Sequence, residues 1–236
     1  MTPKLQQPRV VMCSMWRNDA QRNLPERALH LLAKRFAYPN LRFIWVVGDS
    51  DDETGALLRH YSEGQPVRLV NIGHTGLEGY ARLSATGNEY FNWMRSDDDF
   101  VLVHESDIFS PATIVGDLVD HALCGRCPIA AWPTLELQGE RLFYDIWAFR
   151  AGGVRFTNHP PYHAVYRADR PFLVDSFGTC FLFRAADTSF LHMEERAVLD
   201  LCDQWQQRGE ALWVAPELVV VQPADLWQWQ DSTVLQ

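Results

Sequence analysis

Short apolar runs alternate with segments of helical periodicity through the first half of the chain, and this alternation constrains the fold more than any other feature. Four runs rich in β-branched and aromatic residues have the length of buried strands: 9–14, 41–47, 67–72 and 100–104. Between them, apolar residues recur at helical spacing in 24–34, 55–61 and 80–94. Strands that alternate with helices indicate βαβ units. We therefore expect an α/β protein with a mixed, mainly parallel sheet flanked by helices.

The second half of the chain has a less regular pattern. Further short strands are expected in four segments: 129–133, 180–184, 211–215 and 218–221. A helix is expected from Glu194 to Gln207, ended by Gly209. The 236 residues contain no internal repeat and no clear linker, so we expect a single domain over 1–236, with halves at 9–109 and 110–236.

Charge and composition bear on location and partners. The net charge is −9 and no block of five like charges occurs, which disfavours a broad electrostatic grip on nucleic acid. The first nine residues lack the apolar core of a signal peptide, and no later apolar run approaches the ~18 residues of a membrane helix. We therefore expect a cytoplasmic protein without a membrane span. The five cysteines cannot all pair and mostly lie within apolar stretches, so we expect them to be reduced. Cys124 and Cys127 have CxxC spacing, but no second pair or His pair completes a zinc site.

Two carboxylates one residue apart follow the apolar run 100–104. They belong to Glu105 and Asp107, with Ser106 between them. Open α/β sheets bind ligands at the carboxyl ends of their strands, and both acids offer hard oxygen ligands of the kind that Mn²⁺ and Mg²⁺ prefer. The sequence therefore predicts a metal site at Asp107 and Glu105. The alternative is an ordinary acidic turn that bonds its own backbone.

This layout resembles the GT-A fold glycosyltransferases, in particular family 2-like and fungal mannosyltransferase-like members. Four stretches carry the likeness: 10–18, the acid-rich loop 46–54, the acid pair at 105–107, and 178–184 followed by Glu194 and Glu195. The stretch 144–150 is also similar to a Tyr-Asp-X-Trp-X-X-Arg motif of fungal capsule α-mannosyltransferases. The chain departs from the family in having Glu105 instead of Asp, and Gln222 where related enzymes often place a histidine ligand.

The resemblance implies a metal-dependent hexosyltransferase that moves a sugar from a nucleoside diphosphate sugar to an acceptor hydroxyl. It implies the following donor-binding residues: Ser14, Trp16, Arg17, Asp49, Asp52, Arg82, Glu105 and Ser106. It implies these acceptor-binding residues: Asp145, Trp147, Arg150, Gly178 and Thr179. The candidate general bases are Glu195, Glu194 and Asp175. The cofactor would be Mn²⁺ or Mg²⁺, held by Asp107 with Glu105.

Simpler structural roles stay open for several of these residues. Acids at 194 and 195 could stabilise the start of a helix by meeting its dipole. The acids at 49 and 52 could belong to a solvated helix start. Arg17 and Arg82 could be surface ion-pair partners.

The acceptor and the class of protein also stay open. A glycan, a lipid-linked sugar, a small molecule or a hydroxylated DNA base could receive the sugar, although the acidic charge disfavours DNA. A sugar nucleotidyltransferase is one alternative, but the amino terminus shows no Gly-rich phosphate loop followed by Lys. A non-catalytic carbohydrate-binding protein is another, because nine tryptophans could supply platforms that stack on sugars.

Overall fold

The computed structural model describes residues 7–137, 140–143, 148–155 and 168–223. In chain order the elements are β1 (Val10–Trp16), α1 (Leu24–Ala37), β2 (Leu41–Gly48), α2 (Thr54–Ser62), β3 (Val67–Gly73), α3 (Gly79–Phe91), β4 (Phe100–His104), α4 (Ile114–Leu123), β5 (Ile129–Leu137), β6 (Glu140–Phe143), β7 (Arg150–Ala151), β8 (Val154–Arg155), β9 (Phe172–Val174), β10 (Cys180–Arg184), the 3-10 helix η2 (Ala185–Ser189), α5 (Val198–Gln207) and β11 (Leu212–Pro223).

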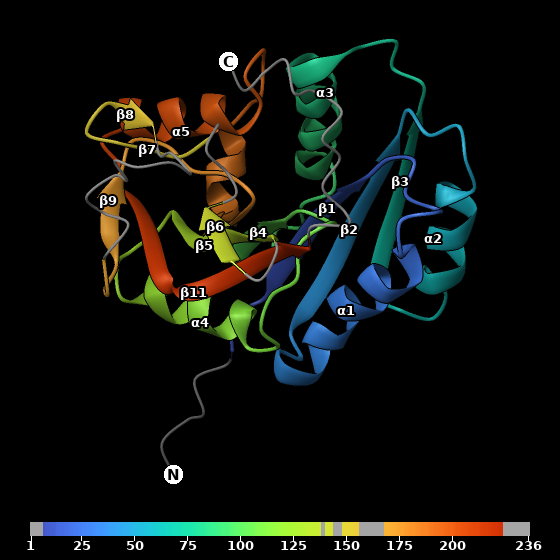
Figure 1. Ribbon diagram of the computed structural model, residues 1–236, viewed down its shortest axis with the longest axis horizontal. Helices are drawn as coiled ribbons and strands as arrows, with labels where there is room; N and C mark the ends of the chain where they lie inside the picture. Colours follow the sequence, from blue (N-terminus) through green and yellow to red (C-terminus); the bar gives the residue numbers. More distant parts are fainter. Residues whose placement is uncertain (1–6, 138–139, 144–147, 156–167, 224–236) are drawn as a thin grey trace.

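One sheet organises the molecule (Figure 1). Among the described residues it has nine strands in the order β3-β2-β1-β4-β10-β5-β11-β9, with β6 paired to β5. β1 to β4 are parallel, β10 runs antiparallel between β4 and β5, and β11 is parallel to β5. The first four strands therefore form the parallel sheet that the alternation predicted. β7 and β8 form a separate hairpin.

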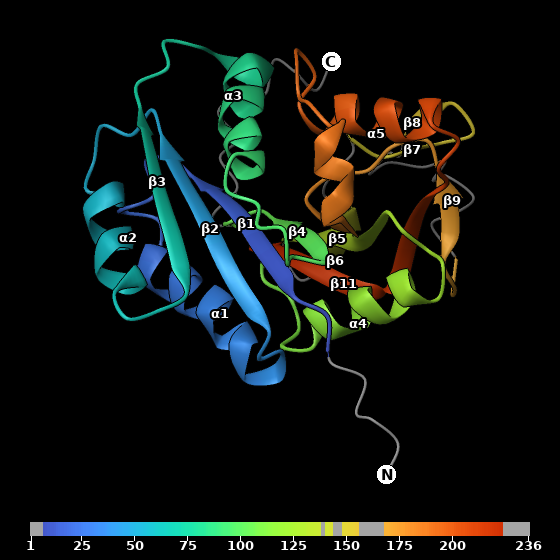
Figure 2. The same ribbon diagram turned by 180° about the vertical axis from the view of Figure 1, so that it is seen from behind.

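Helices cover both faces of this sheet, as Figure 2 shows from behind. Successive side chains of a strand point to opposite faces. Along β1, Val10 and Met12 pack with α1 and α4, whereas Val11 and Cys13 pack with α3 and α5. Two apolar cores result, one on each face. All five cysteines are free, and all except Cys124 are buried.

α1 ties the first core to the loop after β4. Pro25 lies in the first turn of the helix, where its missing N–H costs nothing. Its buried face includes two cations, Arg27 and Lys34, each 2% exposed. The Lys34 ammonium donates to the Ser110 carbonyl at 2.7 Å, and Arg27 reaches Ser106. These charges are buried because their partners lie inside the protein.

The structure corrects two expectations about elements and adds one helix. The two late strands are one strand, β11, whose register against β5 shifts between Ala215 and Val219, around Pro216, which cannot donate a ladder hydrogen bond. The last helix begins at Val198, not at Glu194, because the residue before it takes a left-handed φ of 51°. α4 was not predicted; its apolar sequence contains Gly116, and periodicity does not separate so short an apolar segment from a strand.

Within the described ranges, none of the helices combines the length and apolar character needed to cross a membrane.

Candidate functional site

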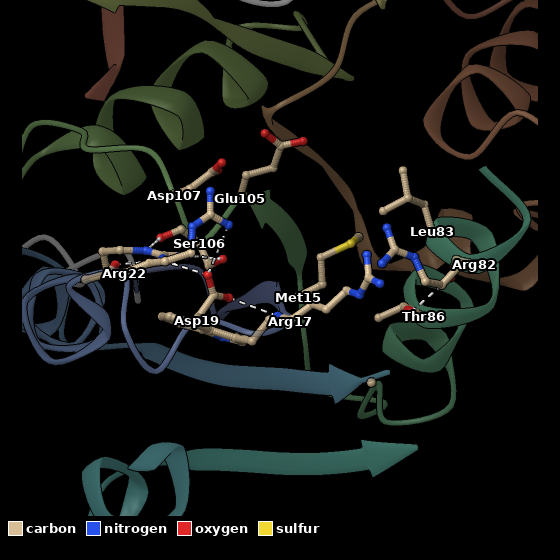
Figure 3. A pocket seen from close by; sticks show the side chains of 13 residues that line it. Met15, Arg17, Asp19, Arg22, Arg82, Leu83, Thr86, Glu105, Ser106 and Asp107 are labelled. Carbon is tan, nitrogen blue, oxygen red and sulfur yellow. Dashed lines mark hydrogen bonds and ion pairs between the residues drawn. The ribbon is translucent and has the colours of Figure 1, made fainter. Parts of the chain in front are cut away.

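A cavity of about 230 Å³ opens where β1, β2 and β4 end (Figure 3). We name it the edge cavity. Its lining is Met15, Trp16, Arg17, Asp19, Arg22, Arg27, Gly48, Arg82, Leu83, Thr86, Glu105, Ser106 and Asp107. This is the carboxyl edge of the parallel strands, where open α/β sheets bind ligands. The topology thus brings the acidic turn of 105–107 to the same place as residues from β1, α1 and α3.

Arg27, on α1, holds the acidic turn of 105–107 in place. Its guanidinium donates to the Ser106 carbonyl at 2.7 Å and to the Ser106 hydroxyl at 2.9 Å. It also pairs with Asp19 at 2.8 Å, and it lies 5.1 Å from the centre of the Trp16 ring. The Ser106 side chain is therefore used to position the turn. Neither Arg27 nor Asp19 was predicted from the sequence; the signal for Arg27 was an arginine on the apolar face of α1.

Asp107 is held by a residue 115 positions later. Nε2 of Gln222, at the end of β11, donates to Oδ2 of Asp107 at 2.6 Å. Gln222 is 2% exposed, and its Oε1 has no hydrogen-bond partner among the described residues. Burial raises the pKa of Asp107, and the charge of Arg27 opposes that rise. Related enzymes often have a histidine at this position. Here the buried side-chain amide of Gln222 contacts the Asp107 carboxylate instead.

The side chains of Arg17 and Arg82 point toward one another at the edge cavity, as Figure 3 shows. Arg82 comes from α3 and Arg17 from the turn after β1, where its Nε donates to the Asp49 carbonyl at 3.3 Å. Burial, and then the charge of Arg17, lower the pKa of Arg82, although Asp49 opposes the shift. Nη1 of Arg82 is buried and, among the described residues, unpaired. Two neighbouring cations with an unmatched donor form an arrangement that favours an anionic ligand.

Asp49 and Asp52 accept hydrogen bonds that stabilise the loops beside the cavity. Asp49 accepts hydrogen bonds from the Thr75 amide and hydroxyl, both at 2.8 Å. Desolvation raises its pKa, but these bonds together with Arg82 and Arg17 outweigh it, so the pKa falls below its usual range. Asp52 accepts from the amides of Ala20 and Thr54, each at 3.0 Å. Neither acid lines the edge cavity, although Asp52 lines a neighbouring hollow at the end of β2.

The expected donor residues thus divide into two groups. Those that line the edge cavity are Trp16, Arg17, Arg82, Glu105 and Ser106. Ser14 is fully buried within β1 and does not line it. Arg22, which the sequence analysis did not name, adds another cation to the lining.

The expected general bases lie elsewhere. Glu194 and Glu195 are exposed in the loop before α5, and they line neither the edge cavity nor a second, mostly apolar cavity beside it, which also shares Met15, Leu83 and Glu105 with the edge cavity. They precede the helix, so the alternative that they occupy its first turn is wrong. The Asp175 carboxylate accepts the Gly153 amide at 2.5 Å, within the β7–β8 region.

The expected acceptor residues are only partly described. Gly178 and Thr179 line the second cavity, beside the edge cavity. Arg150 lies in β7, and its Nε is buried without a partner in the described part of the chain. Asp145 and Trp147 lie outside the described residues.

A resident metal would need ligands beyond the side chains described. In the described ranges, no group of three or more His, Cys, Asp or Glu side chains is placed to hold an ion. Glu105 and Asp107 line the same cavity, and together they offer only carboxylate oxygens. Such a set is suited to a hard cation that keeps open positions for water or for a bound anion.

Comparison with known proteins identifies the fold. No protein-family model and no curated protein sequence matches this chain. The chain is similar to the crystal structure of S. aureus TarS, residues 1–349, in complex with UDP-GlcNAc. The TM-score is 0.58 at 11% sequence identity, over 91% of this chain and 58% of that one, so this chain spans little more than half the length of that structure. The chain therefore has the Rossmann-like GT-A glycosyltransferase fold that the sequence predicted.

Proposed function

We propose that this protein is a glycosyltransferase that binds a nucleoside diphosphate sugar in the edge cavity and transfers the sugar to an acceptor hydroxyl. The observation that carries the proposal is the facing pair Arg17 and Arg82, with the unmatched Nη1 of Arg82. A diphosphate would bring negative charge and acceptor oxygens to these two guanidinium groups. The TarS structure contains UDP-GlcNAc, which agrees with this ligand class.

The cavity suits the departure of a diphosphate. Glycosyl transfer leaves negative charge on the leaving phosphate oxygens, and fixed positive groups that face this charge lower the barrier. Arg82 comes from α3, and Arg17 comes from the turn after β1, where its Nε donates to the Asp49 carbonyl, so the fold brings both cations to this edge. Because Arg27 is already paired with Asp19 and Ser106, it positions the turn and is not proposed to contact the phosphates.

We further propose that the donor binds together with Mn²⁺ or Mg²⁺. Asp107 would hold the ion, with Glu105 as a second carboxylate beside it. Mg²⁺ in proteins is commonly held by one or two carboxylates, waters and substrate phosphates. This fits a cavity in which Asp107 and Glu105 are the acids available, because the third, Asp19, is already paired with Arg27, and no larger ligand cluster occurs among the described residues. When bound, the ion would act as a Lewis acid that neutralises diphosphate charge.

The general base stays a prediction. Glu195, Glu194 and Asp175 could serve an inverting reaction only if the acceptor reaches them, and none of the three lines the edge cavity. A retaining reaction would need no such base. Replacement of each acid by its amide, with transfer measured at saturating donor, would test the three assignments separately.

A thermal-shift experiment tests the donor proposal. A ligand that binds only the native state raises the melting temperature. The wild type, Asp107→Ala and Arg82→Ala would be heated with a panel of nucleoside diphosphates and their sugars, with Mn²⁺ and with a chelator. Arg170→Ala is the matched control, because that arginine is largely exposed and lies outside the cavity.

We expect one nucleotide class to raise the melting temperature of the wild type and of Arg170→Ala in a metal-dependent way. The shift should be lost in Arg82→Ala and lose its metal dependence in Asp107→Ala. If no nucleotide stabilises the wild type over a wide concentration range, the transferase proposal is wrong and a carbohydrate-binding protein becomes the better interpretation.

A further inference from the structure

A second cavity, of about 130 Å³, lies against the edge cavity and differs from it in chemistry. We name it the apolar cavity. Its walls come from the end of β1, from α3, from β4, from the start of β10 and from the first residues of α5. The polar side chains among its lining residues, apart from two tyrosines, are Glu105, Thr179 and Arg196. The rest of the lining is apolar or glycine, for example Leu83, Val103, Phe181, Met193 and Val198.

The two cavities share a wall. Met15, Leu83 and Glu105 line both of them. The Glu105 amide donates to the Thr179 carbonyl at 3.0 Å, which joins the acidic turn to the Gly178–Thr179 side of the apolar cavity. A molecule in the apolar cavity would therefore lie next to the carboxylate that also borders the arginine pair.

The far wall of the apolar cavity is fixed to α3. Asn88 exchanges two hydrogen bonds with the backbone of Met193, at 2.7 and 2.8 Å. The Ala197 amide donates to the Ser84 hydroxyl at 3.2 Å. Gly87 allows this contact, because a Cβ there would lie 2.6 Å from the Met193 sulfur. The loop before α5 is thus held in place, and the cavity is formed before any ligand arrives.

Tyr90 gives this cavity one unmatched polar group. The side chain lines the cavity, is 0% exposed, and its hydroxyl has no hydrogen-bond partner in the described chain. Burial raises the pKa of Tyr90 and the charge of Glu105 adds to the rise, so the phenol stays protonated and can donate. A buried hydroxyl without a partner is rare in proteins, and a ligand atom is one way to satisfy it.

From this geometry we infer that the apolar cavity binds the acceptor, and that the acceptor is a hydroxyl compound with a compact apolar or aromatic body, not a sugar chain. The inference rests on the proposed function. An engineered apolar cavity of about 150 Å³ holds benzene, so this cavity is of the size of one six-membered ring. A pyranose of that size would bury several hydroxyl groups against apolar walls, where they find few partners.

Because the two cavities share a wall, an acceptor in the apolar cavity would lie next to the donor sugar, and the transfer can be written as follows. The acceptor oxygen forms a bond to the anomeric carbon, and the bond from that carbon to the diphosphate oxygen breaks. The nucleoside diphosphate leaves with the electron pair, and the hydroxyl proton of the acceptor passes to water. The product is an aryl-bearing or alkyl-bearing glycoside.

The test uses benzyl alcohol, which combines one ring with one primary hydroxyl, and compares it with methyl α-glucopyranoside. Binding of each to the whole 236-residue chain would be measured by isothermal titration calorimetry, without any nucleotide sugar, so that no turnover occurs. Val198→Phe fills the cavity at a partly exposed position, and Val154→Phe is its control on the exposed β8. Tyr90→Phe removes only the unmatched hydroxyl.

We expect benzyl alcohol to bind the wild type at least tenfold more tightly than the glucoside, and Val198→Phe to weaken that binding at least tenfold while the nucleotide-induced thermal shift stays intact. Val154→Phe should change neither. Tyr90→Phe should weaken benzyl alcohol more than toluene and leave the melting temperature unchanged or higher. Mass spectrometry should detect a benzyl glycoside when the stabilising nucleotide sugar is added.

Several outcomes would overturn the inference. Equal or tighter binding of the glucoside would do so, as would benzyl alcohol binding that ignores Val198→Phe. If Val198→Phe weakens the nucleotide sugar but not the free nucleotide, the cavity holds the donor sugar and the acceptor assignment is wrong. If benzyl alcohol binds but no nucleotide does, the proposed function has failed and the acceptor role falls with it; if only nucleotides bind, the function stands and this inference alone fails.

Discussion

Gln222 has one amide atom in use and one unused. Its Nε2 is bonded to Asp107, and its Oε1 is buried without a partner in the described residues. One hydrogen bond contributes about 1 kcal/mol to stability, and an unsatisfied buried acceptor costs about as much. The residue therefore adds little to the stability of the fold. Its effect should fall on the orientation of the Asp107 carboxylate.

Replacing Gln222 with methionine should separate these two effects. Because Gln222→Met keeps the length of the side chain and removes both amide atoms, we expect the free energy of unfolding to change by less than about 1 kcal/mol. The metal-dependent thermal shift by the nucleotide should shrink. Urea unfolding and the thermal shift measure the two quantities, and a large loss of stability with an unchanged shift would contradict this account.

Arg27 is the residue on which the acidic turn depends most. Arg27→Met would leave the Asp19 carboxylate, which is 5% exposed, without its close cationic partner and would free the Ser106 hydroxyl. Breaking a buried ion pair by removing one partner costs about 3–5 kcal/mol. We expect a loss of that order in urea unfolding, against about 0.5 kcal/mol or less for the exposed control Arg170→Ala. A loss no larger than the control's would show that the pair is not structural.

At the scale of single elements, the start of α5 carries strain. Ala197 takes φ 51° and ψ −122°, a combination that favours glycine, while it is 8% exposed. Such a residue stores about 1–3 kcal/mol, part of which glycine returns as extra freedom of the unfolded chain. We expect Ala197→Gly to raise the free energy of unfolding by about 1 kcal/mol in urea. A loss of stability would mean that packing of the Ala197 methyl group contributes more free energy than the backbone strain costs.

The elements show where sequence reasoning succeeds. β1, β2, β3 and β4 were predicted to within two residues, because continuous apolar runs indicate buried strands. The start of α5 was misplaced because Asp200 accepts the amides of Glu194 and Arg196, and this places the chain outside the helix. Periodicity does not reveal such a contact.

Some residues of the candidate site could be predicted from the sequence, and others could not. Glu105, Asp107, Arg17 and Arg82 stand out because charged residues follow strands or open a helix at one edge of the sheet. The residues that position these side chains, Arg27 and Gln222, could not be recognised from the sequence. Arg27 contacts Ser106 across 79 positions, and Gln222 contacts Asp107 across 115. These pairings depend on the tertiary fold, which local sequence does not specify.

For the whole molecule, two histidines limit stability in acid. Nε2 of His30 accepts from the Ser110 amide at 3.1 Å and lies 2.9 Å from the Lys34 ammonium. Burial, and then the charge of Lys34, lower the pKa of His30 to about 4, and burial lowers the pKa of His104 to about 3. Below pH 6.5 the unfolded chain therefore binds more protons than the folded one, and stability is lost as the pH falls from 6.5 towards 4.

Thermal denaturation across that range tests this prediction. The melting temperature of the wild type should fall between pH 6.5 and 4. His30→Gln keeps an acceptor that takes up no proton, so its melting temperature should fall less steeply. Parallel curves for the two proteins would rule out His30 as a source of the acid sensitivity.

The position of β10 in the sheet has a consequence for how the molecule is made. This strand joins β4 to β5, yet its residues, 180–184, are synthesised about fifty positions after those of β5. As the chain leaves the ribosome, β1 to β4 can pair at once, whereas the outer edge of β4 must wait for residues far downstream. Non-local pairing of this kind is slow. The turn that carries Glu105 and Asp107 is therefore completed late, and a chain halted before residue 180 would present an open strand edge where the finished protein has its site.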